Sequence, residues 1–278
     1  MLFCSTSLAA RIERAETTLV AEAARAIARR DADVFVRDLA GGVAAFTGPG
    51  SPLNKIAGLG FAGAIDVAAL VEIEAVFAAR AAPVQVEVST LADPAVASML
   101  TRRGYVLVGF ENVLGRALVG DVAAHEASGT VVTRAASGEL DVWVDTLVTG
   151  FAAPDVQGVA APEVAIDRAV LEPVIRDFVA ADTVSLYLAR RDAVVVGGAS
   201  MRTHAGIAQL CGAATLPAHR RRGVQTGLLT QRLLDATTAG CELAVLTTLP
   251  GSKSHENAQR RGFELLYTRA MLVRDPRG

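Results

Sequence analysis

The sequence predicts an α/β protein in which one order of strands and helices occurs twice along 278 residues. Segments with alternating apolar residues, typical of strands, are interleaved with segments whose apolar residues recur every three or four positions, typical of helices. Hydrophobic residues make up 51% of the chain and charged residues 20%, which is ample material for a core. A stretch of the first half also recurs in the second half without a gap, so we expect two similar domains with mixed, mostly antiparallel sheets.

The repeat appears when Val86–Arg116 is shifted by 158 positions. Each copy reads as a strand (Val84–Ser89 and Leu243–Thr248), a short helix, an Arg-Gly-aromatic turn and a final strand. The small and polar stretch 120–129 separates the copies and is typical of a linker. We therefore predict domains at 1–122 and 130–278. The matching residues are Thr90-Leu91 with Thr248-Leu249, Arg102-Arg103-Gly104 with Arg260-Arg261-Gly262, Tyr105 with Phe263, Leu114 with Leu272, and Arg116 with Arg274.

Other elements follow from periodicity and from helix-end signals. The first half begins directly in a helix over Leu8–Arg29 and so lacks a leading strand. In the second half Ser137 is an expected N-cap, Pro173 interrupts or begins a helix, and Gly240 is an expected left-handed C-cap. The helices predicted there are Leu140–Phe151, Pro162–Phe178 and Val224–Thr238, and the strands are Val184–Ala189, Ala193–Met201 and Ile207–Thr215.

Charge and cysteine content exclude several classes of protein. The formal net charge of -2 argues against a dedicated nucleic-acid binder, and no apolar stretch is long enough to span a membrane. The start of the chain lacks the pattern of a signal peptide. Cys4, Cys211 and Cys241 are widely spaced without a CxxC pair, which favours a reduced, cytoplasmic protein without a metal site. The sequence does not fix the oligomeric state, and a homodimer is one arrangement that it allows.

A loop with the properties of a phosphate site lies between the strand ending at Thr215 and the helix beginning near Val224. The first turn of a helix offers unpaired N–H groups and a partial positive charge, which attract phosphate. Gly223 lets the backbone approach an anion closely, and the arginines at 220–222 raise the local positive potential. An isolated arginine cluster is usually just solvated, but its place between an apolar strand and an amphipathic helix favours a binding loop.

This segment resembles the GNAT superfamily of N-acetyltransferases. The phosphate loop of that family reads Arg/Gln-x-x-Gly-x-Gly/Ala, and residues 220–225, Arg-Arg-Arg-Gly-Val-Gln, match it except at Gln225. The family's closing segment, an Asn followed by a helix and Gly-Phe, is matched by residues 257–263. The resemblance covers roughly Thr130 to Arg274 with all elements in order, and it makes the fold two GNAT-like domains in tandem, the first a degenerate copy without a phosphate loop.

The resemblance implies an N-acetyltransferase that uses acetyl-CoA as its cosubstrate. Acetyl-CoA would lie between the strand ending at Thr215 and the strand Leu243–Thr248, and an amine of a small molecule would attack the thioester directly in a ternary complex. The oxyanion would meet a backbone N–H near Ala214. The residues implied for cofactor binding are Ala213, Ala214, Thr215, Arg220, Arg221, Arg222, Gly223, Val224, Gln225 and Asn257.

The proton path departs from the family pattern. Many members place a tyrosine four residues before the Gly of Gly-Phe, where it protonates the departing thiolate, and here that position is Ala258. Tyr267 is a poor substitute on the final strand, and His255 and Glu256 read as exposed residues at a helix start. The catalytic groups are therefore unassigned. A non-catalytic acyl-CoA-binding or regulatory module is the alternative that these gaps favour.

A second glycine motif suggests a nicotinamide-dependent oxidoreductase. Gly58–Gly63 is a literal GxGxxG, and Glu87 follows on a strand, as in dinucleotide-binding folds. Against this reading, the preceding strand is short and holds Asn54 and Lys55. The repeat also equates this stretch with the region around Gly212, so we rank it well below acetyl transfer. We expect Cys211 and Trp143 to be core residues.

Overall fold

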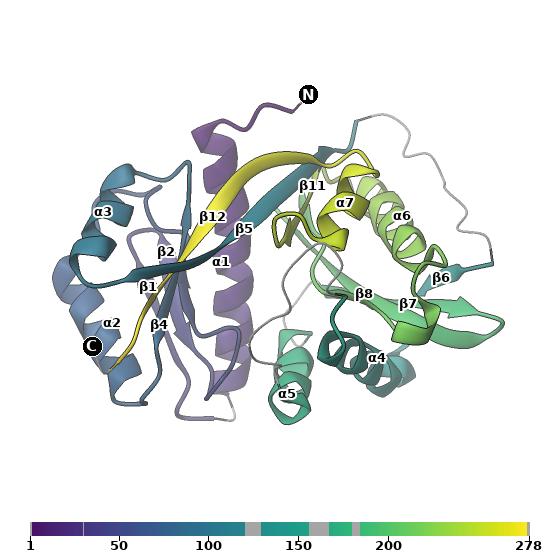
Figure 1. Cartoon of the computed structure of the whole chain (residues 1–278), viewed down its shortest axis with the longest axis horizontal. Helices are drawn as coiled ribbons and strands as arrows, with labels where there is room; N and C mark the ends of the chain where they lie inside the picture. Colours follow the sequence, from purple (N-terminus) through teal and green to yellow (C-terminus); the bar gives the residue numbers. More distant parts are fainter. Residues whose placement is uncertain (1, 30, 120–128, 156–166, 180–183, 277–278) are drawn as a thin grey trace. The chain divides into compact units, whose positions relative to one another are not determined.

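A computed structural model describes residues 2–29, 31–119, 129–155, 167–179 and 184–276 (Figure 1). Its contacts group the chain into two compact units. The N unit comprises Phe3–Val113 with Leu265–Gly278, and the C unit comprises Met1–Leu2 with Leu114–Glu264. The division predicted at 1–122 and 130–278 follows chain order, whereas the contacts place the last strand with the N unit. Residues 120–128 of the predicted linker lie outside the described residues.

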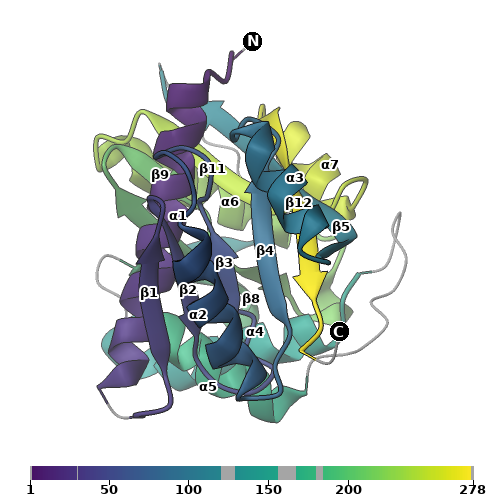
Figure 2. The same cartoon turned by 90° about the vertical axis from the view of Figure 1, so that its left-hand side faces the viewer.

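The N unit is a mixed sheet with helices on both faces, as Figure 2 shows. Helices α2 and α3 pack on one face through the buried side chains of Leu70, Phe77 and Leu100. Helix α1 covers the other face, where Val20 and Ala24 pack on β2. The strand order is β1-β2-β3-β4-β12-β5. The bounds are α1 (Thr6–Ala28), β1 (Phe35–Leu39), β2 (Gly42–Phe46), β3 (Lys55–Ala57), α2 (Val67–Ala78), β4 (Val84–Ser89), α3 (Pro94–Arg102), β5 (Val106–Ala117) and β12 (Glu264–Arg274).

The final strands of the two repeats exchange places. Strand β12, from the second copy, pairs antiparallel with β4 of the first copy, with Arg269 opposite Ser89 and Arg274 opposite Val84. The end of β5, from Leu114 onward, belongs in turn to the C unit, where it is the neighbour of β11 (Leu243–Thr248). The order of elements predicted for each copy is present, but β12 lies in the N unit from Leu265 onward, and the end of β5 from Leu114 onward lies in the C unit.

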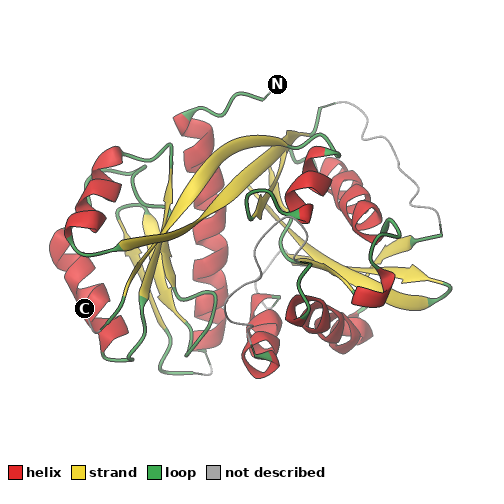
Figure 3. Ribbon diagram, in the orientation of Figure 1, coloured by secondary structure: helices red, strands yellow, loops and turns green. Residues whose placement is uncertain are grey.

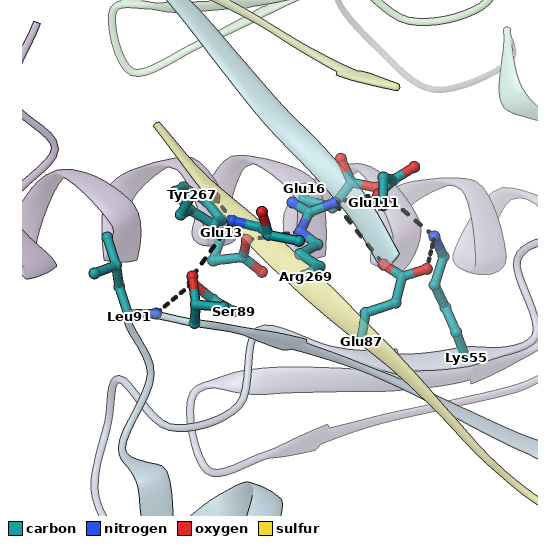
Figure 4. A network of polar contacts seen from close by, with 11 residues as sticks. Glu13, Glu16, Lys55, Glu87, Ser89, Leu91, Glu111, Tyr267 and Arg269 are labelled. Carbon is teal, nitrogen blue, oxygen red and sulfur yellow. Dashed lines mark hydrogen bonds and ion pairs between the residues drawn. The ribbon is translucent and has the colours of Figure 1, made fainter. Parts of the chain in front are cut away.

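A network of buried charges lies between α1 and the sheet of the N unit (Figure 4). Arg269 and Glu13 are each 2% exposed at their side chains, and the Arg269 Nε donates to the Glu13 Oε1 at 2.8 Å. The Tyr267 hydroxyl donates to the same oxygen at 2.7 Å. Further partners are Glu111 at 3.2 Å and Glu87 at 3.9 Å from Arg269, and Glu87 at 2.9 Å and Glu16 at 3.9 Å from Lys55. These contacts fix β12 in the N unit.

The C unit has the strand order β5-β11-β9-β8-β7-β6, with β10 paired to β8. Figure 3 draws its strands in yellow and its helices in red. Helix α6 and Ala258 of α7 pack in one core cluster, and α4 and α5 pack in another together with Leu188 and Ala214. The bounds are β6 (Val131–Arg134), α4 (Leu140–Ala152), α5 (Arg168–Phe178), β7 (Val184–Arg191), β8 (Val194–His204), β9 (Ile207–Gln209), β10 (Ala213–Thr215), α6 (Val224–Thr238) and α7 (Lys253–Gln259). Short 3-10 turns occupy Ser137–Glu139 and Pro217–His219.

Three sequence-based expectations in the C unit need correction. Ser137 is not the N-cap of α4, because it lies in the 3-10 turn that precedes this helix. The Glu139 carboxylate closes that turn by accepting a hydrogen bond from the Ala136 N–H at 2.8 Å. Helix α5 begins after its N-cap Asp167 and runs through Pro173, while 162–166 lie outside the described residues. The single strand predicted at Ile207–Thr215 is interrupted between Gln209 and Ala213.

The glycines of the GxGxxG stretch are explained by close packing. Gly58 and Gly60 have φ of 78° and 87°. A Cβ on Gly58 would lie 2.4 Å from a methyl carbon of Thr17 on α1, and one on Gly60 would lie 2.8 Å from the Ala92 Cβ. Glycine is therefore required at both positions for the loop to fit against its neighbours. These glycines need no bound dinucleotide to account for them.

Candidate functional site

Two parallel strands separate at the centre of the C unit. Strands β9 and β11 pair in parallel up to Gln209 opposite Val245, and the Leu210 N–H donates to the Val245 carbonyl at 2.8 Å. Beyond this point β10 pairs with β8 instead, with Ala213 opposite Ala199, while β11 continues to Thr248. The edge of β10 that faces β11 is consequently available for a ligand to pair with.

A β-bulge marks the point of separation. The Ser200 N–H on β8 faces two residues of the other strand and donates to the carbonyls of Cys211, at 3.2 Å, and Gly212, at 3.0 Å. The Ser200 hydroxyl also donates to the Cys211 carbonyl at 3.0 Å. Bulges re-aim the strand that carries the extra residue. Cys211, expected within the core of a strand, instead lies half-buried at this bulge.

The arginine-rich loop enters α6 with two residues in the left-handed region. Arg221 has a φ of 61°, and Gly223, the N-cap of α6, has a φ of 78° without any side-chain capping bond. The first turn of a helix leaves its N–H groups unpaired, and successive residues of opposite handedness turn such groups toward one concave side. The loop therefore has the backbone geometry of an anion cradle.

Two arginine side chains hold this loop in place. Arg220 donates from Nε to the Thr215 carbonyl at 3.4 Å and from Nη2 to the Ala153 carbonyl, so it connects the loop to β10 and to the end of α4. Arg191 donates to the Arg222 carbonyl at 3.1 Å. Nothing in the loop's own motif indicates Arg191, because it comes from the β7–β8 hairpin.

One cavity of about 810 Å³ brings the loop, the open edge and α7 together. Small-molecule sites commonly fall in this size range. Of the ten residues implied for cofactor binding, nine line it: Ala213, Ala214, Thr215, Arg220, Arg221, Gly223, Val224, Gln225 and Asn257. Arg222 is not among the lining residues. From the facing strand β11 the cavity is lined by Leu246, Thr247 and Thr248.

The lining is strongly cationic and includes residues that the sequence did not indicate. Arg232, Lys253 and Arg260 join Arg220 and Arg221 there, against the single carboxylate of Asp155. Gly150, Phe151 and Pro154 from the end of α4 complete the wall. The signal for Arg232 was present, since it is a charged residue beside Leu233 in the apolar stripe of α6. The part contributed by α4 depends on tertiary packing.

Tyr267 does not belong to this site. Its hydroxyl is bonded to Glu13 in the N unit, and burial, together with the Glu13 charge, raises its pKa far above the ordinary value. Ala258 is buried in the core beside α6. Glu256 pairs with Lys253 and Arg260 at the surface, and the hydrogen bond from Lys253 is the main cause that lowers its pKa. Neither Tyr267 nor Glu256 is among the described residues that line the cavity.

No group of three or more His, Cys, Asp or Glu side chains among the described residues could hold a metal ion. None of the helices in this part of the chain is long and apolar enough to cross a membrane.

One stretch of the chain matches the model of a known protein family. The fold and cavity define an α/β protein with an open strand edge beside a helix N-terminus. Residues 159–263 match the model of the acetyltransferase (GNAT) family, in agreement with the resemblance found in the sequence. The comparison with curated proteins returned no match.

Solved structures support the same fold along most of the chain. A GCN5-related N-acetyltransferase from Kribbella flavida is 23% identical with a TM-score of 0.66, covering 98% of this chain and 96% of that one. A GCN5-related N-acetyltransferase from Sphaerobacter thermophilus is 14% identical with a TM-score of 0.58, covering 76% and 67%. A tandem GNAT protein from the clavulanic acid biosynthesis pathway is 12% identical with a TM-score of 0.59, covering 84% and 79%. The predicted α/β fold of tandem GNAT-like domains is confirmed.

Proposed function

We propose that the C unit transfers the acetyl group of acetyl-CoA to an amine of a small molecule, in a ternary complex. The observation that carries this proposal is the cavity, in which the cradle at Arg221–Gly223 adjoins the unpaired edge of Ala213–Thr215. A cradle of N–H groups suits a pyrophosphate, and an open strand edge suits the amides of a pantetheine arm. The GNAT match supports acyl transfer, and the acetyl group and amine acceptor are the finer part of the proposal.

Different residues along the cavity would bind different parts of acetyl-CoA. Backbone amides from Arg221 to Gln225 would hold the pyrophosphate. Lys253 and Arg260 would add positive charge near the 3′-phosphate on the ribose of coenzyme A. The pantetheine arm would pair with Ala213–Thr215, placing the thioester at the bulge. An acceptor would enter where the end of α4 lines the cavity. A backbone N–H near Ala214 would receive the oxyanion.

We further propose that the N-terminal copy is degenerate and has lost its cofactor loop. The distance from Gly58 to Gly104 is 46 positions, against 50 from Gly212 to Gly262, and the shorter copy has no arginine next to its glycines. Gly58 and Gly60 of this copy pack closely against Thr17 and Ala92. We place the protein in the cytoplasm, since the described cysteines are free and acetyl-CoA is available there.

The test compares Gly223→Asp with Gly240→Asp. Both glycines flank α6 in the left-handed region, with φ of 78° and 74°, so the backbone strain of the substitution is matched. Only the carboxylate at 223 would lie against the phosphates, at a cost of about 2–4 kcal/mol, or roughly a 30- to 1000-fold weaker Kd for coenzyme A. Calorimetric titration measures this. Equal affinity in both variants and the wild type would remove the loop from the site.

A non-catalytic acyl-CoA sensor is the second candidate, favoured by Ala258 and by the lack of an assigned base. Turnover of acetyl-CoA against a panel of amines, read as free thiol release, separates the two. An enzyme releases thiol with at least one amine. A sensor binds acetyl-CoA tightly and releases none.

A further inference from the structure

Arg232 is a buried cation without a counter-ion. It lies in the middle of α6, is 1% exposed and lines the cavity. Its Nε donates to the Leu228 carbonyl at 3.0 Å, and its Nη1 donates to the carbonyls of Ser200 at 3.0 Å and Cys211 at 3.5 Å. All three partners are neutral backbone groups. Within the described residues it makes no ion pair, although buried arginines are rarely left without one.

The contacts of Arg232 fix the orientation of its guanidinium group. Nε is held by its own helix, and Nη1 is held by the two carbonyls at the bulge. Nη2 keeps its two N–H donors without a partner among the described residues, and the side chain borders the cavity. The titratable groups that face the guanidinium are the Cys211 thiol and the Tyr187 phenol, and that phenol donates to Asp235. Burial lowers the pKa of Arg232 to about 10, which reflects the missing negative partner.

An anion forms close to this position during acyl transfer. With the pyrophosphate at Gly223 and the pantetheine arm along Ala213–Thr215, the thioester sulfur would reach the bulge whose Cys211 carbonyl binds Arg232. Ala258, at the position where many GNAT members have their tyrosine acid, is buried in the core and does not line the cavity, whereas Arg232 does. Arg232 is therefore a proton-bearing group at the cavity that could act on the sulfur in place of the missing acid.

We propose that Arg232 is a catalytic residue that stabilises the thiolate of coenzyme A as it leaves, an inference that rests on the proposed acetyl transfer. The amine nitrogen attacks the carbonyl carbon, the N–C bond forms, the C–S bond breaks and its electron pair goes to sulfur. The proton of the new ammonium passes to water. The guanidinium donates an N–H from Nη2 to the thiolate, so the negative charge needs no immediate proton donor.

The test measures the thiol pKa of coenzyme A when it is bound. The ultraviolet absorbance of the thiolate is titrated at saturating coenzyme A, with the desulfo analogue as the blank that cancels the protein's own thiols and phenols. A neighbouring cation lowers such a pKa by about 1–3 units. We expect a value that much below free coenzyme A in the wild type, a return toward the free value in Arg232→Met, and a partial effect in Arg232→Lys.

Arg202→Met is the matched control. Arg202 is also 1% exposed and donates to the Gln209 side chain at 3.0 Å, but it does not line the cavity. We expect its loss to leave the bound thiol pKa unchanged. In Arg232→Met we also expect kcat for thiol release to fall by about 100- to 1000-fold, as for the loss of one oxyanion donor.

The possible outcomes distinguish a failure of the role proposed for Arg232 from a failure of the proposed acetyl transfer. If the wild type does not bind coenzyme A, the proposed function fails. If the wild type binds it but leaves the thiol pKa at or above the free value, acetyl transfer stands and the role of Arg232 is refuted. That measurement needs only the wild-type protein, so it decides the matter even if Arg232→Met does not fold.

Discussion

The buried pair of Arg269 and Glu13 allows a stability prediction for Arg269→Met. Methionine is close to arginine in length and apolar, so the substitution removes the charge with little loss of volume. It leaves the Glu13 carboxylate, 2% exposed at its side chain, with the Tyr267 hydroxyl as the remaining partner of Oε1 among the described residues. In the same part of the chain, the Glu13 Oε2 has no hydrogen-bond partner even in the wild type. The variant therefore holds a buried carboxylate without its cation.

The expected loss is large for one substitution. Removing one partner of a buried pair costs about 3–5 kcal/mol, because the other charge stays buried and uncompensated. With a urea m-value of about 2 kcal/mol/M, the unfolding midpoint should fall by about 1.5–2.5 M. The exposed pair of Arg37 and Glu72, 39% and 64% exposed, is the control in the same unit. Arg37→Met should cost under about 1 kcal/mol.

Two signals distinguish the units during unfolding. Trp143 is the only tryptophan and lies in α4 of the C unit, so its fluorescence follows that unit, while far-UV circular dichroism follows both. We expect the dichroism of Arg269→Met to be lost at lower urea than in the wild type. A midpoint shift no larger than that of Arg37→Met would refute the argument that the network is held by its buried charges.

The loss should also shrink in acid. Burial by itself would raise the pKa of Glu87, but the charges of Lys55 and Arg269 outweigh it and lower that pKa. Its contribution is thus present above the ordinary carboxyl pKa and is lost as pH falls through the lowered value. Burial raises the pKa of Glu111, which therefore protonates earlier. As pH falls through these two pKa values, Arg269 loses the charges of Glu111 and then Glu87, so the difference between wild type and variant should become smaller. A difference that stays constant with pH would contradict this account.

Two other predictions concern packing and connectivity. A Cβ on Gly150 would lie 2.4 Å from the Ala214 Cβ, so Gly150→Ala should displace β10, destabilise the protein by about 1–3 kcal/mol and weaken coenzyme A binding. Gly138 has open space around it, so Gly138→Ala should change neither the stability nor the binding. Urea unfolding measures the stability of both variants, and calorimetry measures their affinity for coenzyme A. Residues 1–122 and 130–278, produced as separate chains, should not fold stably alone but should form a complex when expressed together, because each lacks the final strand that completes its sheet. Cooperative unfolding of either fragment as a monomer, measured after size-exclusion chromatography, would contradict the strand exchange.

Local signals were enough to predict the elements around the phosphate loop. Strand β11 and helix α6 have the predicted bounds, and Gly240 has the left-handed φ of 74° expected after a helix. These features depend on periodicity and on the conformational freedom of glycine, both of which are visible in a short window. The motif at 220–225 is of the same kind, since neighbouring residues form the whole cradle.

The bulge and the contacts that Arg232 makes with it could not be predicted in this way. The interruption after Gln209 depends on Ser200 of another strand, whose N–H accommodates both Cys211 and Gly212. Arg232 reaches the same carbonyls from α6. Each of these contacts joins residues far apart in the sequence, and an apolar run such as 207–215 gives no local sign that its strand will be broken.

The ends of the two final strands bind to corresponding turns of the repeat. Arg116 and Arg274 are equivalent ends of the two copies. Arg116 donates to the Arg261 carbonyl at 2.7 Å, in the turn of the second copy. Arg274 pairs with Glu74, which also binds Arg103 and Tyr105 of the first copy's turn. Arg116 thus binds the turn of the second copy directly, and Arg274 shares the Glu74 carboxylate with the turn of the first copy. The turns of the two copies are equivalent in sequence, so the repeat alone does not say which turn a final strand contacts. The strand pairing in the sheet determines it.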